Sequence, residues 1–180
     1  MKKIMFNITV VIMSAMLLSA CGESSSSPAT YPDPDNPAVT VCEGYIPEPY
    51  TITAYSGENA NVLSDGDAQA VWKQINSLIN GSTPGEVIDL DIYEENLDEY
   101  KQAGRLFELG YEGDYSIEEY DNLFDAIVFI FDGDDLIYGY RTKTDDGAYD
   151  EKIPAYYVIR GDEYSERLNT IEELVFGQNQ

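Results

Sequence analysis

The stretch "AIVFIFDGDDLIYGYR", residues 126–141, carries the strongest structural signal in the chain. Six consecutive apolar residues, 126–131, come before Asp132-Gly133, and a second apolar run, residues 136–140, follows. An Asp-Gly pair between two apolar runs is typical of a β-hairpin, because these residues accept the positive φ angles of tight hairpin turns. The segment therefore predicts two antiparallel strands joined at this turn.

Segments on both sides of the hairpin predict one more strand and several helices. "PAYYVIR", residues 154–160, follows a polar loop and predicts a third strand. Apolar residues at helical spacing predict helices over residues 67–79 and 94–109, a helical turn opened by Ser116, and a last short helix over residues 170–175. Helices first and an antiparallel meander afterwards predict an α+β domain, with helices on one face of a small, about three-stranded antiparallel sheet.

Residues 83–93 have two interpretations. Thr83 as N-cap with Glu86 three residues later forms a capping box, which predicts a short helix. The alternation of Ile88, Leu90 and Ile92 with acidic residues instead predicts a half-buried strand. We favour the helix.

The N-terminus has the layout of a secretory signal peptide. Lys2 and Lys3 precede a mostly apolar run over residues 4–18, which is shorter than the roughly 20 apolar residues that span a bilayer. The sequence "LSAC", ending at Cys21, resembles the lipobox of bacterial lipoproteins. The resemblance implies that residues 1–20 are removed and that Cys21 carries lipid. A plain signal peptide and an uncleaved anchor are the alternatives.

The segment after Cys21 is rich in serine and proline. Residues 22–40 hold four consecutive serines and four prolines, and such a composition buries too little apolar surface to offset the entropy of ordering. We therefore assign residues 21–50 to a lipidated cysteine and a flexible tether, and residues 51–180 to a single acidic domain. Gly22 stands where lipoproteins held at the inner membrane commonly carry Asp, so the resemblance favours the outer membrane, facing the periplasm or the cell surface.

The chain is strongly acidic. It has 34 acidic and 10 basic residues, and without Lys2 and Lys3 the net charge is −26. Such a chain repels nucleic acid, whose phosphates are also negative. The acidity fits either a solvated surface or a surface that attracts a basic partner. We expect the membrane, reached through the lipid, and an envelope protein as partners.

No catalytic constellation stands out. The chain has no histidine, which removes the usual general base and the commonest metal ligand, and we assign no catalytic residue and no cofactor. Asp132, Asp134 and Asp135 are calcium candidates, although they do not match the EF-hand pattern. Cys42 either pairs with another chain, remains a free thiol, or packs as a small buried residue.

Tyrosine is unusually frequent, with 15 residues. Tyrosine is enriched at binding hot spots because it offers rigid contact area. Four tyrosines in the predicted strands are expected to place some rings on an exposed sheet face and to form a partner-binding surface: Tyr138, Tyr140, Tyr156 and Tyr157.

One further resemblance concerns the domain. "INGSTPGEV", residues 79–87, followed later by a hairpin with Asp-Gly in its turn, is similar to the small outer-membrane barrel-assembly lipoproteins (SmpA/OmlA, BamE-like). That resemblance implies two helices on a three-stranded antiparallel sheet and a non-catalytic scaffold role. The family's Leu-Gly-x-Pro is absent, since Leu90 is followed by Asp91, and no functional residue carries over.

These observations predict a lipid-anchored envelope protein that acts as a non-catalytic binding or scaffold module, with a basic protein as the favoured partner. The alternatives are a carboxylate-based hydrolase and a calcium-binding adhesion or matrix lipoprotein.

Overall fold

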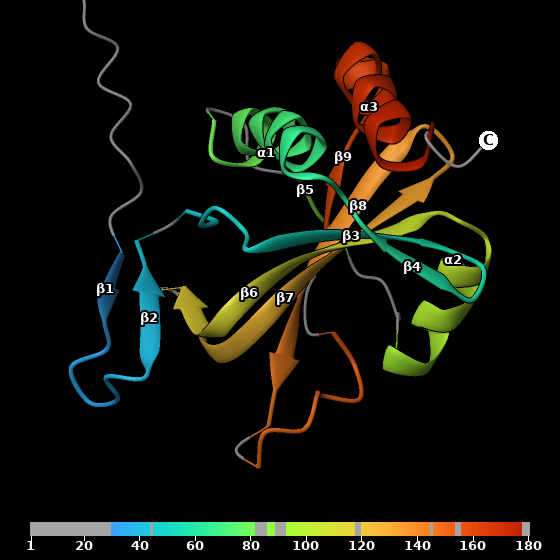
Figure 1. The fold of residues 1–180 in the computed structure, drawn as a ribbon. Helices are drawn as coiled ribbons and strands as arrows, with labels where there is room; N and C mark the ends of the chain where they lie inside the picture. The colour runs from blue at the N-terminus through green and yellow to red at the C-terminus, as the bar shows by residue number, and fades with distance from the viewer. Residues whose placement is uncertain are drawn as a thin grey trace, which may run out of the picture.

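The computed structural model describes residues 30–43, 45–81, 86–88, 93–117, 120–144, 146–153 and 156–177 (Figure 1). Nine strands in these ranges form one mixed sheet that curls into a half-barrel. The strands are β1 (Thr30–Pro32), β2 (Val39–Cys42), β3 (Thr51–Ser56), β4 (Asn59–Val62), β5 (Glu86–Ile88), β6 (Leu106–Ile117), β7 (Tyr120–Asp132), β8 (Asp135–Lys143) and β9 (Tyr156–Ile159). The helices are α1 (Asp65–Ile79), α2 (Leu97–Gln102), which follows the 3-10 turn η1 (Glu94–Asn96), and α3 (Gly161–Phe176).

Strand β7 lies at the centre of the sheet. The strand order is β1-β2-β6-β7-β8-β9-β5, with β3 added to β6 and β4 added to β3. The long strand β6 pairs along one edge with two partners, antiparallel with β3 over its first part and parallel with β2 over its last part. Between these parts the β6–β7 register shifts, and such irregularities bend a sheet.

The predicted hairpin is confirmed. β7 and β8 are antiparallel, Asp132 pairs with Asp135, and Gly133 in the turn has a φ of 64°. β9 follows β8 as the predicted third strand. Residues 86–88 form the strand β5 rather than the helix that we favoured. Of the other residues in the range 83–93, the structure describes only Tyr93.

The predicted fold class is wrong, because the sheet has nine strands instead of about three. The largest error lies in the helix expected over residues 94–109. Gly104, with a φ of 66°, follows α2, and the chain then enters β6, where Phe107 and Leu109 are completely buried against neighbouring strands. Long-range pairing has overridden a local helical spacing. The same strand contains Ser116, where a helical turn was expected, and the short helix expected at residues 170–175 is the 16-residue α3.

Strand pairing begins inside the segment that we assigned to the tether. β1 pairs with β2, and β2 pairs with the end of β6, which buries Val39 and Val41. Two valines at alternate positions supply the apolar face that a half-buried strand needs, even within a proline-rich context. The two-helix, three-stranded arrangement implied by the resemblance to barrel-assembly lipoproteins is not the fold of this chain.

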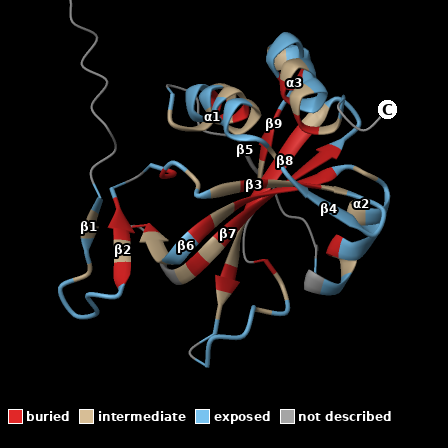
Figure 2. Ribbon diagram, viewed as in Figure 1, coloured by how far each residue is buried: buried red, intermediate tan, exposed pale blue. Residues whose placement is uncertain are grey.

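The core has two parts, one on each face of the sheet. α1 and α3 pack against each other and cover the larger part, to which Val71, Ile75 and Ile171 contribute from the helices. The smaller part lies on the opposite face, where Leu97 of α2 packs with Leu106 and its neighbours. Figure 2 shows the buried residues concentrated along β6, β7 and β8. Within the described ranges, no helix has the length and apolar character needed to cross a bilayer.

Gly161, the first residue of α3, lies at the junction between this helix and the β7–β8 hairpin. A Cβ on Gly161 would collide with the backbone carbonyl of Asp134, and the Gly161 N–H donates to the Asp135 carboxylate (2.8 Å). Gly161→Ala is therefore expected to lower the free energy of unfolding by roughly 1–3 kcal/mol, as overpacking does in other cores. Gly66→Ala in α1 is the control, because its Cβ would meet open space and alanine favours the helix. Urea denaturation of both variants measures the difference, and an equally stable Gly161→Ala variant would contradict the packing described.

Candidate functional site

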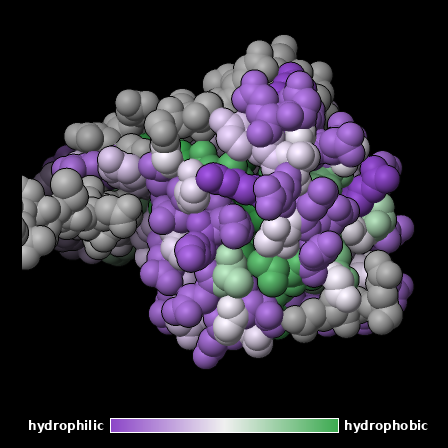
Figure 3. Space-filling view, turned by 90° about the horizontal axis from the view of Figure 1, so that it is seen from above, coloured by the Kyte–Doolittle hydropathy of each residue, from purple (hydrophilic) through white to green (hydrophobic). Residues whose placement is uncertain are grey.

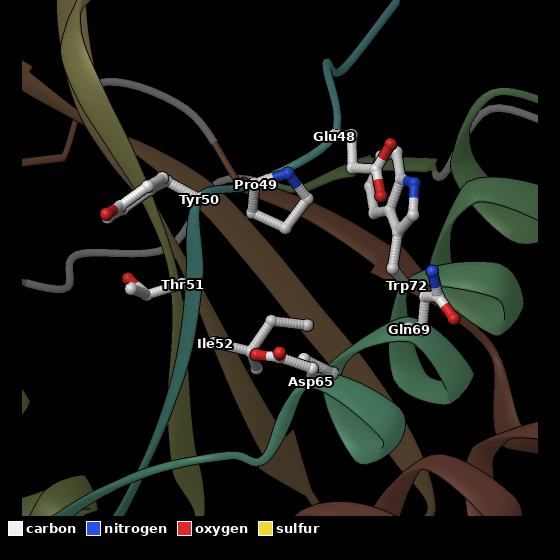
Figure 4. Close-up of a pocket in the computed structure, with 9 residues that line it drawn as sticks. Glu48, Pro49, Tyr50, Thr51, Ile52, Asp65, Gln69 and Trp72 are labelled. Carbon is white, nitrogen blue, oxygen red and sulfur yellow. The ribbon is translucent and has the colours of Figure 1, made fainter.

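A pocket of about 290 Å³ opens between the start of β3 and the first turns of α1 (Figure 4). Its apolar walls come from Pro49, Ile52 and Trp72, and its polar groups come from residues on both elements. Thr51 supplies a polar group at the start of β3, Glu48 supplies one from the segment just before it, and Asp65 and Gln69 supply polar groups from α1. The pocket therefore combines an aromatic and aliphatic lining with two carboxylates and one amide.

The chain that leads into β3 is held in place by hydrogen bonds. The Ile46 N–H donates to the Asn80 side-chain oxygen (2.8 Å), and the Asn80 amide donates back to the Ile46 carbonyl (2.8 Å). At the other end, the Tyr50 N–H donates to the carbonyl of Gly110 (2.9 Å). Because both ends are fixed, the segment that carries Glu48 and Pro49 has a defined position next to α1.

The helical wall of the pocket is fixed in the same way. The Leu63 N–H donates to the Ile52 carbonyl (2.9 Å), which ties the start of α1 to β3. Ser64 is the N-cap of α1, and its hydroxyl accepts from the Asp67 N–H. These contacts place Asp65 and Trp72 opposite the β3 segment, so the pocket is preformed.

The pocket has an apolar floor and a charged rim. Ile52 is buried and Trp72 is half-buried, whereas Glu48 and Asp65 are exposed. Figure 4 shows Glu48 on the same side of the pocket as the indole ring, with Asp65 nearer to Ile52. Tyr50, which is 72% exposed, points its ring away from the indole. The arrangement suits a ligand with an apolar stem and a positively charged end.

A second polar cluster lies across β3, β6 and β8, around Glu108. Tyr55 donates its hydroxyl hydrogen to Glu108 Oε2 (2.8 Å), while Lys101 and Arg141 approach Oε1 at 4.0 and 3.7 Å. Burial, followed by the hydrogen bond to Glu108, raises the pKa of Tyr55 well above its usual value. Oε1 itself is buried and has no hydrogen-bond partner.

The cluster continues along the strands to Lys143. The Lys143 ammonium lies 2.8 Å from Asp114 and 2.7 Å from Asp125, and hydrogen bonds to these two carboxylates raise the pKa of Lys143. The Arg141 guanidinium stacks over the Tyr149 ring at 3.8 Å. The basic groups of this cluster therefore face carboxylates and rings of the same molecule.

The calcium candidates lie at the β7–β8 turn. Asp132 and Asp134 are exposed there, and the Asp135 carboxylate accepts from the Arg160 guanidinium (2.8 Å) and from the Gly161 N–H. Among the described residues, no three acidic or cysteine side chains are grouped as a metal ion would require. Asp135 links the hairpin to α3.

Of the four tyrosines predicted to face a partner, one is buried in the core and two are half-buried against it. Tyr138 is only 3% exposed and stacks between Phe129 (5.5 Å between ring centroids) and Tyr157 (5.1 Å). Tyr140 and Tyr157 are half-buried against the same core, and the side chain of Tyr156 lies outside the described residues. The expectation of an exposed face is wrong for Tyr138, because α1 and α3 cover this side of the sheet.

The structure describes one of the two cysteines, Cys42. Cys21 lies outside the described residues. Cys42 is a free, fully buried cysteine, and burial raises the pKa of its thiol to about 11. Cys42 thus combines two of the alternatives left open by the sequence, a free thiol and a small buried residue.

The pocket was not found from the sequence. Trp72 lies in the helix predicted over residues 67–79, and Glu48 and Tyr50 lie in the predicted tether, so the sequence pattern does not bring them together. The available signal was "IPEPY", in which two prolines fix an extended backbone next to a charged and an aromatic residue. Comparison of the chain with protein-family models, curated proteins and solved structures found no match.

The contacts of Asp135 predict that the stability of the fold depends on pH. The hydrogen bond from Gly161, followed by the hydrogen bond and charge of Arg160, lowers the pKa of Asp135 in the folded protein. The unfolded chain therefore binds a proton at this carboxylate more readily than the folded protein does. Asp135 thus raises the free energy of unfolding above about pH 4, and this stabilisation is lost as the pH falls through the lowered pKa of the folded state. Asp135→Asn is expected to lower the melting temperature at pH 7 and to cost progressively less below about pH 4. A deficit that stays constant down to strong acid would contradict the ion pair, and Glu172→Gln on an exposed face of α3 is the control.

Proposed function

We propose that this chain is a lipid-anchored protein of the bacterial cell envelope that binds a basic protein partner without catalysing a reaction. The lipobox resemblance at Cys21 supports the anchor, and the mature charge of −26 supports a basic partner. The pocket between β3 and α1 is the observation that carries the proposal, because its described lining includes two carboxylates and no basic group.

The distribution of charge favours the same partner. Among the described residues, Lys101, Arg141 and Lys143 form ion pairs in the cluster around and beyond Glu108, and Arg160 pairs with Asp135. Basic groups held in this way neutralise carboxylates of the same molecule, and the chain as a whole carries a large excess of acidic residues. Seen from above, hydrophilic side chains cover most of the visible described surface, with apolar areas between them (Figure 3). The net negative charge of the chain accelerates encounter with a basic protein.

The hydrolase alternative has one observation in its favour, since Glu48 and Asp65 line the same pocket. A carboxyl that acts as a general acid near neutral pH needs an environment that shields it from water. Both side chains are exposed on the rim, so the arrangement favours charge recognition over proton transfer.

The partner can be tested by capture from solubilised envelopes, followed by quantitative mass spectrometry. A tagged native lipoprotein is expected to enrich one or a few basic proteins at low salt, and the double variant Glu48→Gln/Asp65→Asn is expected to reduce that enrichment about tenfold, equivalent to about 1.4 kcal/mol. Glu172→Gln/Glu173→Gln removes the same charge from α3 and serves as the matched control. Equal recovery by all three proteins, or recovery of no basic protein, would contradict the proposal.

The anchor has its own test. Mass spectrometry of the mature N-terminus is expected to find an acylated Cys21, and Cys21→Ser is expected to release the domain from the membrane or leave the precursor uncleaved. Stable anchoring requires more than one acyl chain of buried methylenes, so loss of the modified cysteine removes the attachment entirely. An unmodified N-terminus at another residue would show that the lipobox interpretation is incorrect.

A further inference from the structure

We propose that the pocket between β3 and α1 binds a single arginine side chain of the basic partner. The inference rests on the proposed function and names the group that enters the site. Three properties of the pocket support arginine: its apolar walls, its arrangement of acceptors and its size.

The apolar walls match the uncharged part of an arginine side chain. Ile52 and Pro49 offer aliphatic surface for the methylene stem, which arginine commonly lays along such surface while its charged end stays near water. The half-buried indole of Trp72 lines the same pocket. A guanidinium group stacks on an indole face through both cation–π attraction and planar contact.

The polar groups on the rim match the charged end. Glu48 and Asp65 contribute carboxylate oxygens, and Gln69 contributes an amide oxygen from the next turn of α1. A guanidinium carries five N–H donors in one plane, so it can stack on the ring and donate to a carboxylate on the same side of the pocket, where Glu48 lies. A lysine ammonium has three donors in a compact head and cannot stack in this way. The pocket therefore discriminates in favour of arginine.

The size and rigidity of the pocket fit one side chain. A volume of about 290 Å³ lies just below the range of about 300–1,000 Å³ that is typical of small-molecule sites. The hydrogen bonds from Ile46 to Asn80 and from Leu63 to Ile52 hold both walls in place without a ligand. A preformed pocket loses little entropy when it is filled.

A neutral sugar ring is the other ligand that an aromatic wall with carboxylates could hold. Such a ligand would gain no charge–charge attraction from Glu48 and Asp65. The acidity of the lining, together with that of the whole chain, therefore favours the cation. A methyl glycoside serves as the competing probe in the titration.

Trp72 is the single tryptophan of the chain, so its fluorescence reports on the pocket directly. The mature lipoprotein in detergent is titrated with N-acetylarginine amide, with the lysine analogue, and with N-acetylcitrulline amide, a neutral molecule of nearly the same shape as the arginine analogue. Arginine amide is expected to change the Trp72 emission saturably, the lysine analogue is expected to bind several-fold more weakly, and the citrulline analogue is expected to bind at least tenfold more weakly.

Variants locate the response. Asp65→Asn and Glu48→Gln are each expected to weaken arginine binding several-fold, with a thermal melt to show that each variant is folded. Glu58→Gln, in the exposed β3–β4 turn, removes the same charge outside the pocket and is expected to leave binding unchanged. Equal responses to arginine and citrulline, an equal effect of Glu58→Gln, or a response to a methyl glycoside in place of arginine would overturn the inference. A protein that captures its basic partner yet shows no arginine response would overturn this inference alone, whereas loss of both would contradict the proposed function as well.

Discussion

Four stacked aromatic rings across β6, β7, β8 and β9 fix the register of the sheet on which the rest of the structure depends. The ring centroids of Phe107 and Phe129 lie 4.8 Å apart, those of Phe129 and Tyr138 lie 5.5 Å apart, and those of Tyr138 and Tyr157 lie 5.1 Å apart. Each of these pairs is also a register pair between neighbouring strands. A slip of one residue between two strands would turn the rings of one strand to the opposite face. The rings thus determine which face of the sheet is apolar enough to receive α1 and α3.

The pocket inherits its geometry from this arrangement. Ala54 of β3 pairs with Phe107, the first ring of the row, so the strand that supplies the pocket floor is in register with the aromatic residues. α1 is anchored on the same core by Val71 and Ile75, and this orientation brings Trp72 to the edge of the core, where one side of the ring packs inward. The opposite face of the sheet carries the charged cluster around Glu108. The two faces of the sheet therefore have different roles. The face covered by α1 and α3 positions the pocket, and the other face holds several of the basic side chains in internal ion pairs.

Local signals predicted the parts of the fold that short-range chemistry determines. The Asp-Gly turn and its two apolar runs predicted β7 and β8, and the helical spacing around Trp72 predicted α1. The parts that failed depend on pairing between distant segments. The start of β6 was included in the predicted helix because Phe107 continues the helical spacing of the apolar residues Leu97, Tyr100 and Ala103. Pairing with β3 and β7 makes this segment a strand. The sequence does not show which face of the sheet the helices cover, so Tyr138 was expected at a surface although it is buried. The pocket is made from two segments that folding brings together, and the sequence did not predict it.

The central claim is that an acidic, anchored module receives a basic partner at the pocket between β3 and α1. Hydrogen–deuterium exchange of the mature lipoprotein, with and without its captured partner, tests that claim most directly, because it locates a binding surface without any substitution. The account predicts added protection in residues 46–52 and in the first turns of α1, where Asp65 and Gln69 face the pocket. Protection confined to the β7–β8 turn, to α3 or to the cluster around Glu108, with the pocket segments unchanged, would contradict it.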